Sequence, residues 1–436
     1  MKSMLKKPYN QAFIILLFVY LITVSGALSR GHDWGDDFAS YIMQAKSILT
    51  STEQQFYEHN SFTILNSSEV LGPVAYPWGY PLILAPFYKF FGLHRLALKI
   101  PTIIFFALFL IVFFTSLSRR LSGWERVLLC AVLAFNPFLL SFQDQIWSDI
   151  PFLFFSTLAI FQIDSFVYRY EKFDNTSLNY LLLGLSIFLA NFMRTTGVLL
   201  LGTFLICQLI RIGQQWKKNK KIGPISAIWL IPHLVYGGLR FIVSIAFPSG
   251  ESSYLMSIPT GNFAESLLNN IHYYANLMED FMPHAPSARI VYSFLLVSFC
   301  IGLTERILED YPFILYGTFT IGILLLWPPK QGLRFFIPII PFFLYFSFMG
   351  MKILFSSLRK IDFRTQKVLT WLIWIVLVIT SVTESFHYVR DNLANNRQVA
   401  GPFDPGSSAM FNFIRESTAA DSTIIFFKPR AMRLIT

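Results

Sequence analysis

Apolar runs of about twenty residues recur along the whole chain, and they leave little choice of fold. A helix of about 20 mostly apolar residues is needed to cross the hydrocarbon core of a bilayer. Charged residues occupy only 14% of the 436 positions, whereas a soluble domain carries about 25%. This composition excludes a disordered chain and argues against a soluble enzyme. The sequence therefore predicts an all-α polytopic membrane protein.

Eleven runs are long and apolar enough to be transmembrane helices. Lysines precede the first run, as in a signal peptide, but residues 30–33 do not form the small-residue site that cleavage requires. We therefore expect an uncleaved anchor at residues 11–28. The other predicted spans are residues 97–117, 127–143, 149–168, 178–193, 195–212, 224–246, 289–303, 311–327, 335–352 and 368–384.

The formal charge of +10 comes from lysines and arginines that gather in alternate loops. These are the even-numbered loops, counted from an N-terminus in the cytoplasm, and cytoplasmic loops of membrane proteins carry such an excess. The charge therefore indicates membrane orientation and not nucleic-acid binding. It places the odd-numbered loops and the segment after Glu384 on the outer face.

Two predicted outer loops, residues 29–96 and 247–288, are too long to be simple turns. Their apolar residues recur at helical spacing, which predicts amphipathic helices in the membrane interface, and long ordered loops usually carry function. A transmembrane domain of residues 1–384 is followed by a polar outer segment, residues 385–436. In that segment residues 422–427 are typical of a short strand. The sequence ends soon afterwards, which favours a truncated segment.

An acidic pair, Asp36 and Asp37, follows the first apolar run and precedes a predicted helix. A carboxylate held at a membrane exit can accept the proton of an attacking hydroxyl, so this pair is a candidate general base. The alternative is that the pair only caps the helix, because acidic residues at helix N-termini are stabilising.

Aromatic residues and a second set of acids lie near the predicted outer ends of the helices. Tyr76 and Tyr80 can stack on a sugar ring, or they can belong to the aromatic belt at the headgroup level. Asp144 and Asp149 can contact substrate hydroxyls, although Asp149 with Pro151 also suits simple helix capping. Two separated acids do not make a metal site, and nucleotide and zinc motifs are absent. We therefore predict no metal and no cofactor.

Basic residues on the predicted outer side are candidates for binding a phosphate. The planar guanidinium of arginine donates paired, charge-assisted hydrogen bonds to phosphate oxygens. Arg334 and Lys330 lie before a late apolar run, and Arg194 lies between two runs. The alternatives are interfacial anchoring for Lys330 and Arg334, and pairing with an acid for Arg194.

These motifs, in this order, resemble those of the GT-C glycosyltransferases. More narrowly they resemble bacterial relatives of the dolichyl-phosphate-mannose protein mannosyltransferases and of the aminoarabinose transferases of lipid A. The resemblance extends over most of the chain. The matching elements are the acidic pair followed by Tyr41 and Ala45, a Pro-Trp-Gly-Tyr-Pro-Leu stretch within residues 77–92, residues 148–152, residues 194–197 and residues 334–341.

The resemblance implies a GT-C membrane bundle, which the count of apolar runs sets at about eleven helices, with interfacial helices in the first outer loop above a donor cavity. It implies a polyprenyl-phosphate-linked sugar as donor and a protein, lipid or glycan hydroxyl as acceptor. Asp36, the first acid of the pair, corresponds to the general base of that family. Asp37 and Asp149 would then position the reactants, Tyr41 and Tyr80 would lie at the sugar pocket, and basic residues would bind the phosphate.

We therefore expect an inverting glycosyltransferase at the outer face of a bacterial cytoplasmic membrane. A flippase or transporter for lipid-linked sugars is the main alternative, because it would use the same polar residues without chemistry. Asp164 and Arg240 favour that alternative, since charges at mid-membrane mark transport pathways. A non-catalytic membrane scaffold is the third possibility.

Overall fold

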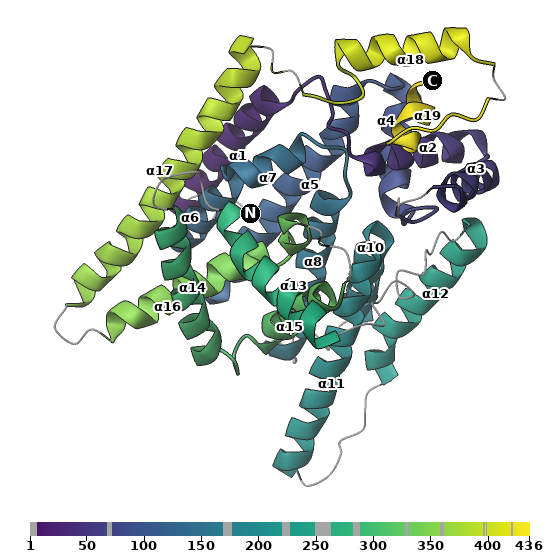
Figure 1. Ribbon diagram of the computed structural model, residues 1–436. Helices are drawn as coiled ribbons and strands as arrows, with labels where there is room; N and C mark the ends of the chain where they lie inside the picture. Colours follow the sequence, from purple (N-terminus) through teal and green to yellow (C-terminus); the bar gives the residue numbers. More distant parts are fainter. Residues whose placement is uncertain are drawn as a thin grey trace.

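The computed structural model describes residues 7–67, 72–168, 177–219, 227–248, 263–281, 288–327, 330, 332–357, 362–395, 397, 399–419 and 422–436. Within these ranges the regular structure is entirely helical (Figure 1). The prediction of an all-α membrane protein is therefore confirmed. The predicted strand at residues 422–427 is wrong, because these residues form neither a strand nor a helix.

Seven helices of the described residues are long and apolar enough to span a membrane, and a bent pair makes a possible eighth. The pair, α6 (Gly123–Ala134) and α7 (Pro137–Gln143), bends by 61° because Asn136 caps a new helix that begins at Pro137. The count of eleven spans is thus not confirmed, although three shorter apolar helices occupy other predicted spans. The seven long spans belong to α1 (Pro8–Ala27), α5 (Arg95–Ser116), α8 (Asp149–Tyr168), α11 (Val198–Asn219), α12 (Ile231–Ala246), α14 (Ala288–Glu305) and α17 (Phe363–Asn395), and the shorter helices are α10 (Ser177–Met193), α15 (Tyr311–Leu326) and α16 (Ile340–Ser356).

The first long loop folds into three helices, α2 (Asp36–Thr50), α3 (Glu53–Leu65) and α4 (Gly79–Phe91). The predicted apolar stripe of α2 is buried, and α2 packs against α4. In the second long loop, α13 (Phe263–Leu277) forms as predicted, and residues 249–262 and 282–287 lie outside the described residues. We call the end of the bundle that carries α2, α3 and α4 the α2 end.

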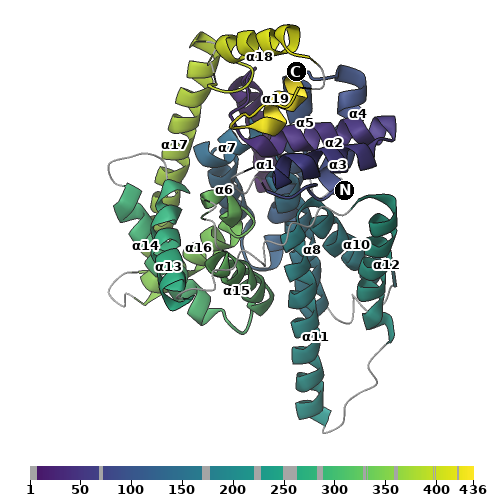
Figure 2. The same ribbon diagram turned by 45° about the vertical axis from the view of Figure 1, so that its right-hand side comes forward.

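The C-terminal segment returns to the α2 end. Its helices α18 (Pro405–Ser417) and α19 (Pro429–Ile435) lie at the same end as α2 to α4 in both views (Figures 1 and 2). Helix α19 packs directly on α2. The approach before α18 is so close that a Cβ atom on Gly401 would lie 1.8 Å from the carbonyl oxygen of His32. The last residues of the chain therefore cover the start of the first loop.

Candidate functional site

Arg334 joins two acids from distant parts of the chain at the α2 end. Its Nη1 donates to Asp37 Oδ2 at 2.7 Å and its Nε donates to Asp149 Oδ2 at 2.8 Å. Asp37 lies in the first turn of α2 and Asp149 at the start of α8, while Arg334 belongs to a short 3-10 turn, η6 (Leu333–Phe336). The guanidinium also lies over Trp147, with Cζ 4.4 Å from the ring centroid, which fixes its plane.

Arg194 supplies a second guanidinium to the same cluster. Its Nη1 donates to Oδ1 of Asp149, and its Cζ lies 4.6 Å from the ring centroid of Phe335. It stands before the 3-10 turn η2 (Thr195–Gly197), which turns sharply enough that a Cβ atom on Gly197 would lie 2.3 Å from the backbone nitrogen of Asn191. Asp149 is nearly fully buried and accepts from both arginines, so it holds two cations side by side. The predicted pairing of Arg194 with an acid is therefore present.

Three tyrosines close the cluster on the side of α2 and α4. The hydroxyl of Tyr76 donates to Asp37 Oδ1 at 2.5 Å. Tyr41 shares a hydrogen bond of 2.8 Å with Ser148, the residue before Asp149. The Tyr80 ring packs edge-on against Tyr41, and its buried hydroxyl has no hydrogen-bond partner among the described residues.

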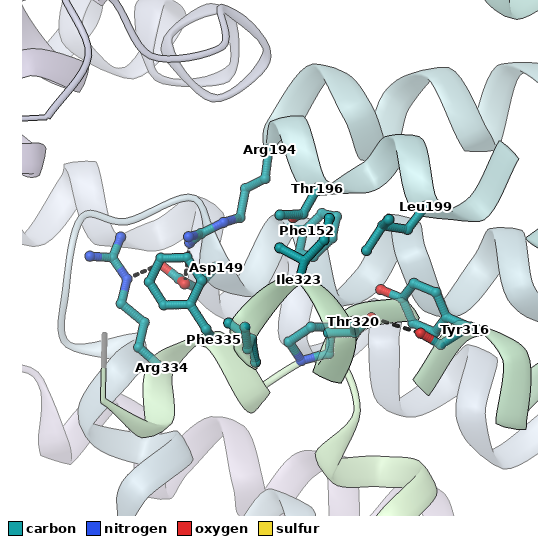
Figure 3. Close-up of a pocket in the computed structure, with 12 residues that line it drawn as sticks. Asp149, Phe152, Arg194, Thr196, Leu199, Tyr316, Thr320, Ile323, Arg334 and Phe335 are labelled. Carbon is teal, nitrogen blue, oxygen red and sulfur yellow. Dashed lines mark hydrogen bonds and ion pairs between the residues drawn. The ribbon is translucent and has the colours of Figure 1, made fainter. Parts of the chain in front are cut away.

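A cavity opens beside the two arginines, between α8, η2, α11, α15 and η6 (Figure 3). Its polar end is formed by Asp149, Arg194 and Arg334, with the two arginine side chains approaching Asp149 from different elements. The rest of its wall is mainly apolar. That part consists of Phe152, Leu199, Tyr316, Ile323, Leu324, Phe335 and Pro338, with Thr196 and Thr320.

The charges of the cluster set the protonation of its acids. Burial by itself raises the pKa of Asp37, but the charge of Arg334 and the hydrogen bond from Tyr76 outweigh it and hold that pKa below its usual range. Burial by itself lowers the pKa of Arg334, but the charges of Asp149 and Asp37 raise it by more. The net pKa of Arg334 lies above its usual value, so Arg334 stays charged. Burial and the neighbouring Asp37 charge raise the pKa of Tyr76. At neutral pH the cluster therefore holds ionised Asp37 and a neutral Tyr76.

Asp36 lies apart from this cluster, although the resemblance assigned it the role of base. Its Oδ1 accepts from the backbone N–H of Ala431 at 3.3 Å, and its Oδ2 lies 3.8 Å from Nε of Arg430 in α19. Burial raises its pKa, against the opposing charge of Arg430. The structure thus brings Asp37, and not Asp36, to Arg334.

Asp144 belongs to a separate, buried network. Its carboxylate accepts from Lys99 Nζ at 2.7 Å and Arg397 Nη2 at 2.5 Å, and from the backbone and hydroxyl of Ser29 at 2.7 Å each. Asp144 therefore ties α5 and the end of α17 to the segment after α1 and does not join the arginine cluster. Lys330 likewise lies elsewhere, with Nζ 5.0 Å from the ring centroid of Tyr273.

Asp164, which favoured transport in the sequence, is also paired. It lies toward the other end of α8 from Asp149, and it accepts from Arg119 at 2.7 Å and from Arg120 at 2.6 Å. Arg120 also donates to Asp310 at 2.6 Å, so the two arginines and the two buried acids form one ion network of four residues. The charge of Asp164 is therefore compensated by ion pairs, which is typical of a structural role and not of a residue that lines a transport pathway.

The sequence reasoning missed Lys99, Arg397, Arg430 and Trp147. Lys99 carried a signal, because a lone lysine in an apolar run requires a buried partner or a nearby interface. Arg397 and Arg430 gave no such signal in the sequence, because each donates a hydrogen bond to a residue more than 250 positions earlier. Within the described ranges, no group of three or more histidine, cysteine, aspartate or glutamate side chains is placed to hold a metal ion.

No protein-family model and no curated protein matches the sequence. The structure, however, is similar to that of ArnT from Cupriavidus metallidurans bound to undecaprenyl phosphate, with a TM-score of 0.54 at 10% identity over 96% of this chain and 84% of that one. It is also similar to the apo oligosaccharyltransferase of Archaeoglobus fulgidus, with a TM-score of 0.57 at 9% identity over 95% of this chain and 59% of that one.

A third structure is that of the archaeal oligosaccharyltransferase AglB from Archaeoglobus fulgidus in complex with an inhibitory peptide and a dolichol-phosphate. The TM-score is 0.51 at 10% identity, over 94% of this chain and 58% of that one. The chain thus spans less than two thirds of the archaeal enzyme and most of ArnT. Likeness at such identities is a likeness of fold. The chain is thus similar in fold to ArnT and to the archaeal oligosaccharyltransferase, which is the GT-C likeness that the order of its motifs predicted.

Proposed function

We propose that the chain is an inverting glycosyltransferase that moves a sugar from a polyprenyl-phosphate-linked donor to an acceptor hydroxyl. The observation that carries the proposal is Arg334, which bridges Asp37 and Asp149 at the polar end of a cavity whose remaining wall is mainly apolar. A lipid phosphate has both parts that such a site matches, an anionic head and an apolar tail. The fold supports the proposal, because ArnT of the same fold was solved bound to undecaprenyl phosphate.

The two arginines are suited to the leaving phosphate. When the glycosidic bond breaks, its electron pair goes to the phosphate oxygen, and negative charge grows on the lipid phosphate. Fixed guanidinium groups that face this charge in a site of low dielectric stabilise it strongly. Asp149 holds Arg194 and Arg334 side by side, so we assign Asp149 the role of positioning them.

Asp37 is the better placed of the two acids to act as general base. Attack by the acceptor oxygen forms a new bond to the anomeric carbon, and the hydroxyl proton passes to a carboxylate. Asp37 is ionised, one quarter exposed and next to the arginines, whereas Asp36 is nearly buried under α19. We therefore move the proposed base from Asp36 to its neighbour.

Binding of the donor would itself activate Asp37. The free site pairs Arg334 with Asp37, which keeps this carboxylate a weak base. A phosphate that draws Arg334 toward itself removes part of that stabilisation, and the pKa of Asp37 then rises toward the value a base requires. Proton abstraction is in this way coupled to the presence of the donor.

We place the reaction at the outer face of a bacterial cytoplasmic membrane, with the N-terminus inside. The support is the alternation of basic loops along the sequence, which puts the α2 end outside. Tyr76 contacts Asp37, Tyr41 packs on Tyr76, and Tyr80 packs on Tyr41. We propose that these three tyrosines border the sugar or the acceptor. We assign Lys330 a peripheral role in attracting the phosphate, because it lies on Tyr273 and outside the cluster.

The test uses purified protein in lipid with a panel of polyprenyl-phosphate sugars and a mixed acceptor extract. Mass spectrometry follows release of the free lipid phosphate from the wild type, Asp37→Asn and Asp36→Asn. Asp362→Asn is the matched control, because Asp362 is exposed and caps the start of α17. We expect release by the wild type and the control, loss in Asp37→Asn and partial activity in Asp36→Asn. A wild type that releases nothing but moves labelled lipid across the bilayer would be a transporter.

A further inference from the structure

Arg430 is a fully buried arginine at the α2 end that the proposed mechanism does not use. It lies in α19, and its Nη2 donates to the carbonyl oxygen of Pro73 at 2.6 Å. Its Nε lies 3.8 Å from Asp36 Oδ2. Neither Nε nor Nη1 has a hydrogen-bond partner among the described residues, and the same is true of Asp36 Oδ2. Two opposite charges are thus buried together and only partly satisfied.

Burying Arg430 and Asp36 costs free energy, because a charge removed from water is destabilising unless another charge offsets it. Arg430 contacts the acidic pair through Asp36, whereas Arg334 contacts it through Asp37. The Cζ of Arg430 also lies 5.7 Å from the ring centroid of Tyr76, the tyrosine that donates to Asp37. The backbone of α19 adds a hydrogen bond from Ala431 to Asp36. All these contacts converge on the first turn of α2.

We propose that Arg430 is a positioning residue that neutralises Asp36, so that the acidic pair presents one negative charge, on Asp37, to the reacting groups. The C-terminal helix is then part of the active site. This inference rests on the proposed function for its catalytic consequence, and its structural part stands without that function.

The physical basis is repulsion between neighbouring carboxylates. With both acids ionised, each would raise the pKa of the other. Arg430 opposes this by lowering the pKa of Asp36, and it also lowers that of Asp37. The other groups that act on the pair are Lys428 before α19, Arg334 of η6 and Tyr76 before α4.

The charge count gives a specific test with three variants. Arg430→Gln leaves Asp36 unbalanced, so the acid limb of kcat/KM should move up by about 1 pH unit. Asp36→Asn leaves no negative charge at position 36 to repel Asp37. The acid limb of kcat/KM in this variant should therefore lie at the wild-type pH or lower. The double variant Asp36→Asn with Arg430→Gln restores the balance and should restore the wild-type limb. A role of Arg430 in packing alone would leave the double variant as impaired as Arg430→Gln.

Arg433→Gln is the matched control. Arg433 lies on the same helix and contacts His59 of α3, so its loss weakens the docking of α19 without touching the acidic pair. We expect a lower melting temperature and an unchanged acid limb. A limb that moves equally in Arg433→Gln and Arg430→Gln would show that docking and not charge is responsible, and would overturn the proposal.

A second readout does not depend on transfer. Thermal unfolding in detergent is measured at pH 5 and pH 8 for the same variants. Without Arg430 the pKa of Asp36 in the folded protein rises further, and its ionisation then destabilises the fold as pH rises through that value. Arg430→Gln should therefore lose more stability at pH 8 than at pH 5, and the double variant should lose equally at both. Equal loss in Arg430→Gln at both pH values overturns the pairing, even if the wild type transfers no sugar.

Discussion

Arg334 and Asp149, 185 positions apart, are joined by a hydrogen bond of 2.8 Å. The same guanidinium reaches Asp37 at 2.7 Å, so one side chain ties the first turn of α2 to the start of α8. The planar fork of arginine makes both contacts at fixed angles, which a lysine cannot do. The geometry of the proposed site therefore depends on a single residue near the end of the bundle.

Replacing Arg334 by Lys or Gln should abolish most activity. Loss of one preorganised donor to a developing anion costs about 100-fold or more in kcat. Here Arg334→Gln also leaves Asp37 and Asp149 without their bridge, so Arg334→Lys should recover charge but not alignment. Steady-state release of lipid phosphate measures both variants.

Lys330→Gln is the control for this prediction, because Lys330 lies nearby in sequence but rests on Tyr273. We expect a modest rise in KM at low salt and little change in kcat. Equal losses in Lys330→Gln and Arg334→Gln would mean that general positive charge, and not the bridge, binds the donor.

Tyr76→Phe should change the pH dependence more than the maximal rate. The Tyr76 hydroxyl donates to Asp37 and helps to lower its pKa. Without it that pKa rises, and the acid limb of kcat/KM should move up by about 1 pH unit, since hydrogen bonds to charged groups contribute about 1.5–3 kcal/mol. An unchanged limb would show that Asp37 is not the group whose ionisation controls the reaction.

Much of the fold was predictable, since each predicted span except 127–143, which is the bent pair α6 and α7, corresponds to one apolar helix. Interfacial segments in the first loop were also expected. The number of true spans was not, because composition does not show that a helix breaks at Asn136 or is only 16 to 17 residues long. Hydropathy reports which segments leave water. It does not report how far each one reaches across the bilayer.

The site was predictable as a set of residues but not as a geometry. Asp37 and Tyr41 are four positions apart and share a helix face, and Tyr41 contacts Ser148 next to Asp149. This spacing could have favoured Asp37 over Asp36 as the acid that faces α8. Arg430 could not have been foreseen, because its contact with Asp36 depends on a C-terminal helix that returns across nearly the whole sequence.

Asp144→Asn should damage stability and not donor binding. Asp144 is buried between Lys99 and Arg397, and removing one partner of a buried ion pair costs about 3 kcal/mol or more. We expect a lower melting temperature in detergent and an unchanged KM in the fraction that remains folded. A raised KM with normal stability would return Asp144 to the substrate site that the sequence first suggested.

Gly401→Val should displace the C-terminal segment, because any Cβ atom at this position collides with the carbonyl oxygen of His32. Overpacking of this kind costs about 1–3 kcal/mol, and here the segment around Gly401, before α18, can relieve it by moving away from the first loop. This movement would withdraw α19 and Arg430 from Asp36, so the acid limb of kcat/KM should move up as it does in Arg430→Gln. Hydrogen exchange of the Ala431 amide, which donates to Asp36, would report the displacement directly.

Gly406→Val is the control for this prediction, since the nearest atom to a Cβ there is Asp404 Oδ1, at an ordinary 3.4 Å. If the Ala431 amide stays protected from exchange in Gly401→Val, the segment around Gly401 does not hold α19 in place. The role of the C-terminal segment would then be limited to α19.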